Sequence, residues 1–160
     1  MKMLYFAMVH SHIVYCLNVF SCANVTTLKP LKLKQKEAIR IICNAGYRDH
    51  TGPLFKRLGI LPFDELVTYS QLKFMHSFYH KKLPDSFNEM WVSNRIRNPD
   101  IVLRNVDNLY VPAHHFATTK RFPLFNFPKV WNDASIIKNN PSQRVFLRSV
   151  KSAMLNLIIV

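Results

Sequence analysis

The sequence is poor in glycine and in acidic residues, and both shortages exclude classes of site. It has 3 glycines and 9 prolines among 160 residues. Glycine-rich phosphate loops are therefore absent, and helices joined by stiff turns are favoured over a sheet of tight hairpins. Its 9 Asp and Glu residues are scattered, with no two aspartates adjacent. The sequence therefore lacks the adjacent aspartates that a two-metal catalytic site would use. The one adjacent acidic pair, Asp64-Glu65, suits the first turn of a helix.

Cysteine is equally scarce. Cys16, Cys22 and Cys43 are odd in number and irregular in spacing. A disulfide framework needs pairs of cysteines in an oxidising compartment. We therefore expect small, buried, reduced thiols and an intracellular protein, of the nucleus or the cytoplasm.

The first 25 residues contain an apolar run that resembles a secretory signal peptide. His10, Ser11 and His12 interrupt its middle, and the run is too short to span a bilayer. A buried helix is the favoured interpretation, and no membrane partner is expected. The packed face predicted for this helix consists of Leu4, Met8, His12, Tyr15 and Val19.

A strong positive charge points to the class of partner. The 22 Lys and Arg residues give a formal net charge of +13, while 49% apolar residues are enough for a core. Such a field favours an anionic partner, most often nucleic acid and sometimes a membrane surface. The alternative is an isolated piece whose acidic neighbours lie on another segment.

Residues 28–66 predict three helices in close succession. The first carries apolar positions at steps of three and four, with Gly46 as the left-handed residue after its end. Its expected inner face consists of Leu28, Leu31, Gln35, Ala38, Ile39, Ile41, Ile42 and Ala45. Thr51 is the predicted N-cap of a short helix that Gly59 ends, and Pro62 precedes the third helix.

The third helix carries an apolar stripe, and the chain becomes irregular beyond it. The stripe consists of Phe63, Leu66, Val67, Ser70, Gln71, Phe74, Met75 and Phe78. A short helix over 84–91 follows, and residues 93–108 are expected to form an exposed linker that carries Arg95, Arg97 and Arg104. Residues 109–111 and 122–127 are extended candidates that could pair as a small hairpin. Ser142 is the predicted N-cap of a last helix, whose inner face consists of Val145, Phe146, Ser149, Val150, Ala153 and Leu157.

The fold expected from these elements is mainly α. Residues 1–92 form a helical bundle, and residues 93–160 form the arginine-bearing linker, the hairpin and a C-terminal helix. Trp131 is expected to be buried against that last helix. His76 and His80 share a helical face, but no third ligand is indicated, so we predict no metal site and no cofactor.

A series of short motifs runs along almost the whole chain. LKQKEAIRII stands at 33–42, HT at 50–51, PLFK at 53–56, KVWN at 129–132 and IIK at 136–138. In order and spacing they resemble the region after the catalytic core in reverse transcriptases of non-LTR retrotransposons, of the jockey-like type in animals. The resemblance implies the thumb and the segment after it, which grip the template–primer duplex. It implies no catalytic residue, because the palm and its adjacent aspartates have no counterpart here.

We therefore predict a non-catalytic chain that binds RNA or an RNA/DNA duplex, with a separate reverse transcriptase core as a further candidate partner. The helix over 31–45 is favoured for binding, and Phe116, Phe122 and Phe125 could stack on bases near His114-His115. The candidate phosphate-binding residues are Lys29, Lys32, Lys34, Lys36, Arg40, Arg48, Lys56, Arg57, Lys120 and Arg121. Two alternatives stay open: an inert remnant of a mobile-element gene, and a secreted basic protein with a cleaved leader.

Overall fold

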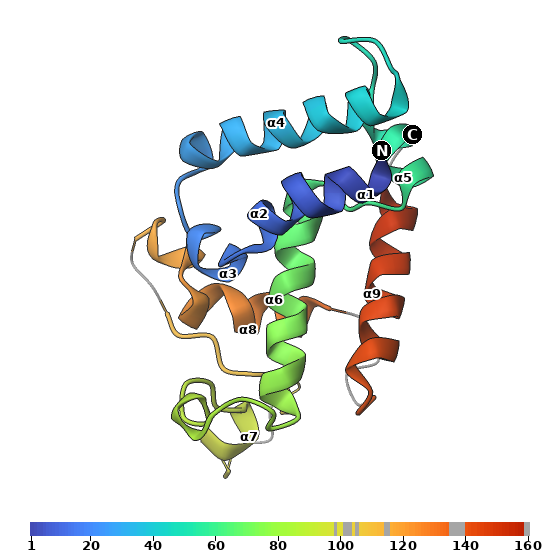
Figure 1. Cartoon of the computed structure of the whole chain (residues 1–160). Helices are drawn as coiled ribbons and strands as arrows, with labels where there is room; N and C mark the ends of the chain where they lie inside the picture. Colours follow the sequence, from blue (N-terminus) through green and yellow to red (C-terminus); the bar gives the residue numbers. More distant parts are fainter. Residues whose placement is uncertain (98, 101–103, 105, 114–115, 135–139, 159–160) are drawn as a thin grey trace. The chain divides into compact units, whose positions relative to one another are not determined.

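The computed structural model describes residues 1–97, 99–100, 104, 106–113, 116–134 and 140–158, and it is mainly helical (Figure 1). The predicted fold class is confirmed. The chain forms two compact units, Met1–Ser70 with Leu147–Val160, and Gln71–Phe146. These bounds differ from the predicted regions 1–92 and 93–160, because α6 (Phe63–Tyr79) and α9 (Gln143–Leu157) each contribute to both units.

The N-terminal segment is helical but broken. It consists of α1 (Lys2–Leu4), the π-helix η1 (Tyr5–His10), α2 (Ser11–Val14) and α3 (Leu17–Phe20). Cys16 separates α2 from α3 with a left-handed φ of 52°. This cysteine is exposed, against the prediction, although all three cysteines are free as expected.

The predicted inner face of this segment is wrong. Leu4, Met8, His12, Tyr15 and Val19 are exposed, and the buried side chains are Tyr5, Ile13 and Leu17. Two apolar stripes run along these helices, so periodicity alone could not choose between them. The buried stripe is the one that contains Tyr5, whose hydroxyl finds a buried partner in Gln35.

The long basic helix α4 covers Val25–Cys43, with Asn24 as its N-cap. Gln35 and Ile39 are buried on the predicted face, but Ile41 is 66% exposed. The left-handed residue after the helix is Asn44, with φ 51°, and not Gly46. Asparagine can take this conformation at a helix end because its short polar side chain can form local hydrogen bonds.

The next two helices begin and end close to the predicted residues. α5 covers Thr51–Leu58, with His50 in the N-cap position and Thr51 as the first helical residue. Gly59 ends it with a φ of 64°, as predicted. α6 follows, with Asp64 and Glu65 in its first turn.

The core of the first unit is built from side chains of the N-terminal helices, α4, α5, α6 and the turn between α5 and α6. One cluster contains Tyr5, Ile39, Phe55 and Ile60, and another contains Ile13, Leu17, Leu61, Phe63 and Leu66. Figure 1 shows α4 beside the N-terminal helices whose side chains share these clusters. Met154 and Leu155 of α9, and Ile158 just after it, pack against the clusters. Of the inner face predicted for this helix, Phe146 and Val150 are buried, but the other four residues are exposed: Val145, Ser149, Ala153 and Leu157.

Aromatic rings form much of the core of the second unit. Trp91 lies 5.0 Å from Phe78 and 6.1 Å from Phe127, measured between ring centroids. Trp131 is 2% exposed and lies 5.5 Å from Tyr79 and 5.8 Å from Phe146. The predicted burial of Trp131 against the last helix is confirmed.

Residues 122–127, predicted to be extended, lie mostly in α8 (Pro123–Asp133). Pro123 stands at the first helical position, where its missing N–H costs nothing. Pro128 lies inside the helix and cannot donate to the carbonyl of Leu124. That carbonyl accepts a hydrogen bond from Trp91 Nε1 at 3.3 Å, so a tertiary contact replaces the missing helical bond.

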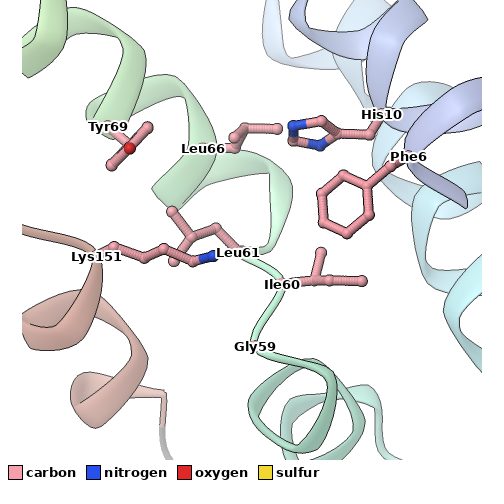
Figure 2. Close-up of a pocket in the computed structure, with 8 residues that line it drawn as sticks. All are labelled: Phe6, His10, Gly59, Ile60, Leu61, Leu66, Tyr69 and Lys151. Carbon is pink, nitrogen blue, oxygen red and sulfur yellow. The ribbon is translucent and has the colours of Figure 1, made fainter. Parts of the chain in front are cut away.

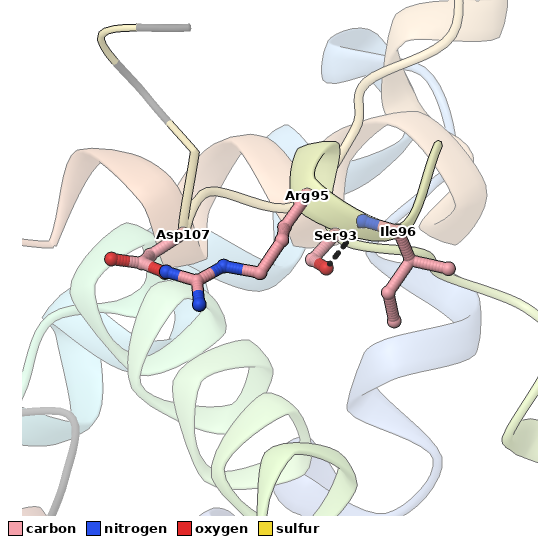
Figure 3. A network of polar contacts seen from close by, with 4 residues as sticks. All are labelled: Ser93, Arg95, Ile96 and Asp107. Carbon is pink, nitrogen blue, oxygen red and sulfur yellow. Dashed lines mark hydrogen bonds and ion pairs between the residues drawn. The ribbon is translucent and has the colours of Figure 1, made fainter. Parts of the chain in front are cut away.

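The predicted hairpin between residues 109–111 and 122–127 is therefore wrong, because most of the second segment is helical. Leu109 instead forms an antiparallel bridge with Ser93, an isolated one within the described ranges. The Arg95 N–H donates to Val106 O and the Tyr110 N–H to Val92 O. Arg95 lies in α7 (Asn94–Arg97), and its side chain reaches Asp107 (Figure 3). Arg95 Nη2 lies 2.9 Å from Asp107 Oδ1.

Two 3₁₀ turns complete the second unit. η2 covers Asp85–Phe87, which is shorter than the helix predicted over 84–91, and η3 covers Thr119–Arg121. The predicted motif at 136–138 lies outside the described residues.

Two imidazoles lie side by side at the end of α6, with His76 inside the helix and His80 in the turn that follows it. The rings of His76 and His80 are 4.3 Å apart, and His76 is fully buried. His76 Nε2 lies 2.8 Å from Asn140 O, while its Nδ1 has no hydrogen-bond partner among the described residues. Burial lowers the pKa of His76, and the charges of His80 and Lys82 lower it further, outweighing the bond to Asn140. The folded chain therefore favours the neutral form of His76 at neutral pH.

Deleting the Trp131 ring should destabilise the chain. We expect Trp131→Ala to lower the free energy of unfolding by about 3–5 kcal/mol, the range for a large buried aromatic side chain. Urea denaturation followed by circular dichroism measures this. Phe116→Ala is the control because Phe116 is 73% exposed; equal stability losses in the two variants would contradict the packing described above.

The neutral state of His76 should make stability depend on pH. An unfolded histidine has a pKa near 6.5, so the unfolded chain binds a proton below that pH while folded His76 resists it. We expect the free energy of unfolding to fall as pH drops below about 6.5, by at most about 1.4 kcal/mol per pH unit from this residue. His76→Gln should flatten the dependence, whereas the same change at the exposed His12 should leave it intact.

Candidate nucleic-acid interface

Four cations of α4 share one side of the helix. Lys29, Lys32, Lys36 and Arg40 follow one another at steps of three, four and four residues, which places them within one stripe. This stripe flanks the buried face that contains Gln35 and Ile39. Lys34 falls outside it, since two residues correspond to a rotation of about 200° around a helix.

Lys32 is occupied by contacts within the first unit. Its Nζ lies 2.6 Å from Asp64 Oδ1, and it lies 5.8 Å from the centre of the Phe63 ring. The Lys32 side chain is 27% exposed. These contacts tie α4 to the first turn of α6 and neutralise the charge of Lys32 locally.

Lys34 is also paired, although it is exposed. Its Nζ donates to Glu37 Oε2 at 2.8 Å. This hydrogen bond, together with the negative charge of Glu37, raises the pKa of Lys34. A phosphate would have to compete with Glu37 for this cation.

Two arginines join the ends of α4 and α5. Arg40 Nε donates to Asp49 O at 3.0 Å, across the loop between the helices. Arg57 Nη2 donates to Cys43 O at 3.4 Å, at the C-terminal end of α4, where a cation also complements the helix dipole. Each guanidinium has five N–H donors, so both arginines keep donors for a phosphate.

The loop between these helices has its own internal bond. The Gly46 N–H donates to Asp49 Oδ2 at 2.7 Å. A Cβ at Gly46 would come within 3.2 Å of that carboxylate, so a side chain here would require the Asp49 side chain to shift slightly. The loop is thus held by two hydrogen bonds at Asp49. Its carboxylate accepts from the Gly46 N–H, and its backbone carbonyl accepts from Arg40.

The predicted cations therefore divide into different groups. We use the term basic corner for the set that lies on the α4 stripe, the loop after it and the end of α5: Lys36, Arg40, Arg48, Lys56 and Arg57. Lys36, Arg48 and Lys56 are exposed. Lys29 continues the stripe toward the start of α4, whereas Lys32 and Lys34 are paired with carboxylates.

Lys120 and Arg121 belong to the second unit, in η3. Phe116 and Phe122 near them are 73% and 54% exposed, as a base-stacking role requires, and Phe125 is half-buried. His114 and His115, predicted as part of the same loop, lie outside the described residues. This group is a separate candidate surface.

The described part of the chain also bears on metal sites and membrane spans. Within the described ranges, no group of three or more His, Cys, Asp or Glu side chains is placed to hold a metal ion. No helix in that part of the chain is long and apolar enough to cross a membrane.

Comparison with known proteins adds no relative. No protein-family model, curated protein or solved structure matches this chain. The resemblance to non-LTR reverse transcriptases therefore stays a prediction.

Two acidic residues that shape the interface were missed from the sequence. The sequence predicts Asp64 only as part of a helix start, yet Asp64 pairs with Lys32, which is 32 positions away. It predicts no role for Asp49. No local spacing signals either contact, because both depend on how separate helices pack. The sequence therefore could not show which cations of the interface are paired with the side chain or backbone of an acidic residue.

The Lys32–Asp64 pair can be tested by a double-mutant cycle with Lys32→Met and Asp64→Asn. We expect a coupling of about 0.2–1 kcal/mol in the free energy of unfolding, the usual range for a pair of which one partner is exposed. The coupling should shrink at high salt. Zero coupling at low salt would mean that Lys32 is free for phosphate.

Proposed function

We propose that this chain binds RNA or an RNA/DNA duplex, with little sequence preference, through the basic corner together with Lys29. The observation that supports this most directly is the position of Arg40 and Arg57. Both are held by backbone carbonyls, and both retain guanidinium donors at an exposed helix end. Contacts of this kind fix position and orientation on a phosphate backbone without reading bases.

The dimensions suit a duplex. Lys29 and Arg40 are 11 residues apart on α4, which corresponds to about 16 Å along the helix axis. A duplex presents one negative charge about every 1.7 Å of its axis. A ridge of this length can therefore meet several phosphates at once.

The acidic residues of the chain support a non-catalytic role. The 9 acidic residues include no adjacent aspartates, so the chain would hold a template–primer duplex for an active site that lies elsewhere. A thumb-like origin in a non-LTR reverse transcriptase would supply such a partner, a separate polymerase core. This part of the proposal depends on the motif resemblance and on the mainly α fold.

The main alternative is a folded remnant of a mobile element with no selected task. Its net charge of +13 would still attract RNA weakly. A diffuse attraction depends on total charge, whereas a site depends on particular cations. Removing two cations from the basic corner, or two from elsewhere, therefore separates the two alternatives.

The salt dependence of binding should report the number of phosphates that the chain neutralises. If about four phosphates are neutralised, log affinity should fall with log salt with a slope near −3 to −4. Lys36→Gln combined with Lys56→Gln should make that slope shallower by about one to two units and should weaken all sequences alike. Fluorescence anisotropy with a labelled RNA/DNA duplex measures both quantities.

The matched control removes the same charge elsewhere. Lys73 and Lys129 are exposed cations of α6 and α8 in the second unit. Replacing both with Gln should leave the slope nearly unchanged. Equal losses in the two double variants would favour the diffuse attraction of an inert remnant.

A further inference from the structure

A cavity of about 130 Å³ lies within the first unit (Figure 2). Its walls come from the N-terminal helices, the turn between α5 and α6, α6 itself and α9. The lining residues are Phe6, His10, Gly59, Ile60, Leu61, Leu66, Tyr69 and Lys151.

The polar groups of this cavity favour an anion. Lys151, on α9, lines the cavity together with Leu61 (Figure 2). None of the described lining residues is acidic. His10 Nδ1 is buried and has no hydrogen-bond partner among the described residues. Burial and the nearby charge of Lys151 both lower the pKa of His10, so the imidazole is neutral and the cation is Lys151.

Apart from the phenol of Tyr69, the remaining wall is apolar. Ile60, Leu61 and Leu66 are buried core residues that present their side chains to the cavity (Figure 2). Gly59 adds a bare stretch of backbone, because a Cβ there would meet nothing within 4 Å. An occupant must therefore combine one anionic end with a short hydrocarbon end.

We propose that this cavity binds a small branched aliphatic monocarboxylate. The carboxylate lies against Lys151 Nζ and accepts a hydrogen bond from the Nδ1–H tautomer of His10, while the branched end packs on Ile60, Leu61 and Leu66. A cavity of about 150 Å³ takes benzene, so a space of this size holds an acid of about six non-hydrogen atoms. A nucleotide is far too large, which separates this site from the basic corner.

The test uses two probes of the same shape. Isobutyrate and isobutyramide each have six non-hydrogen atoms but differ in charge. Titration of the full chain followed by ¹H–¹⁵N NMR should show saturable shifts at Gly59, Ile60 and Leu61. We expect a dissociation constant of about 1 mM for isobutyrate, within reach of a ligand of this size. Isobutyramide should bind at least about tenfold more weakly, because hydrogen bonds to charged groups are the stronger ones.

Variants then assign the charge. Lys151→Met should weaken isobutyrate about tenfold and leave isobutyramide unchanged. Arg148→Met is the matched control, since Arg148 is an exposed cation one turn earlier on α9 that does not line the cavity. It should leave both probes unaffected.

Several results would overturn the proposal. These are equal affinities for the two probes, equal losses in the two variants, or no saturation by about 100 mM isobutyrate, two orders of magnitude above the expected constant. The comparison of the acid with the amide uses the unaltered chain, so it decides the matter even if Lys151→Met does not fold.

Discussion

The first unit depends on one buried amide. Gln35, in the middle of α4, is 1% exposed, and its Nε2 donates to Tyr5 OH at 3.0 Å and to Leu61 O at 3.1 Å. Both amide hydrogens are thus satisfied, and three segments far apart in sequence meet at one group. Removing either acceptor would leave a buried donor unpaired, at a cost of about 1–3 kcal/mol. Burial raises the pKa of Tyr5 despite its bond to Gln35, so the phenol stays neutral.

The burial of Gln35 also affects which cations of α4 reach solvent. A helix has one rotational setting about its axis, and the inward position of Gln35 selects it. The stripe through Lys36 and Arg40 then lies beside the core, and Lys34 lies away from it, where Glu37 is its partner. Arg40 is close enough to the following loop to bind Asp49 O. The electrostatic surface of the unit is therefore a consequence of how one neutral polar group is buried.

The same physics explains what the sequence could and could not predict. Gly59 and the start of α6 were predictable, since glycine conformation and acidic first turns act locally. The inner face of α4 was largely predictable because Gln35 and Ile39 recur with the helical period. The N-terminal face was not, because the choice of Tyr5 over Leu4 depends on Gln35, which is 30 positions away. Likewise, the helix that contains Pro128 depends on Trp91, whose indole bonds the carbonyl that proline leaves open.

Burial separates two ways in which this unit can use positive charge. At the basic corner, Lys36, Arg48 and Lys56 are exposed, so salt screens them over about 8–10 Å at ordinary ionic strength. They suit a large polyanion that replaces many counterions at once. Lys151 is half-buried beside a neutral imidazole and apolar walls, where water and salt screen a charge much less. One ammonium there can act on one small anion, so the difference between the two kinds of site lies in solvent access and not in the number of cations.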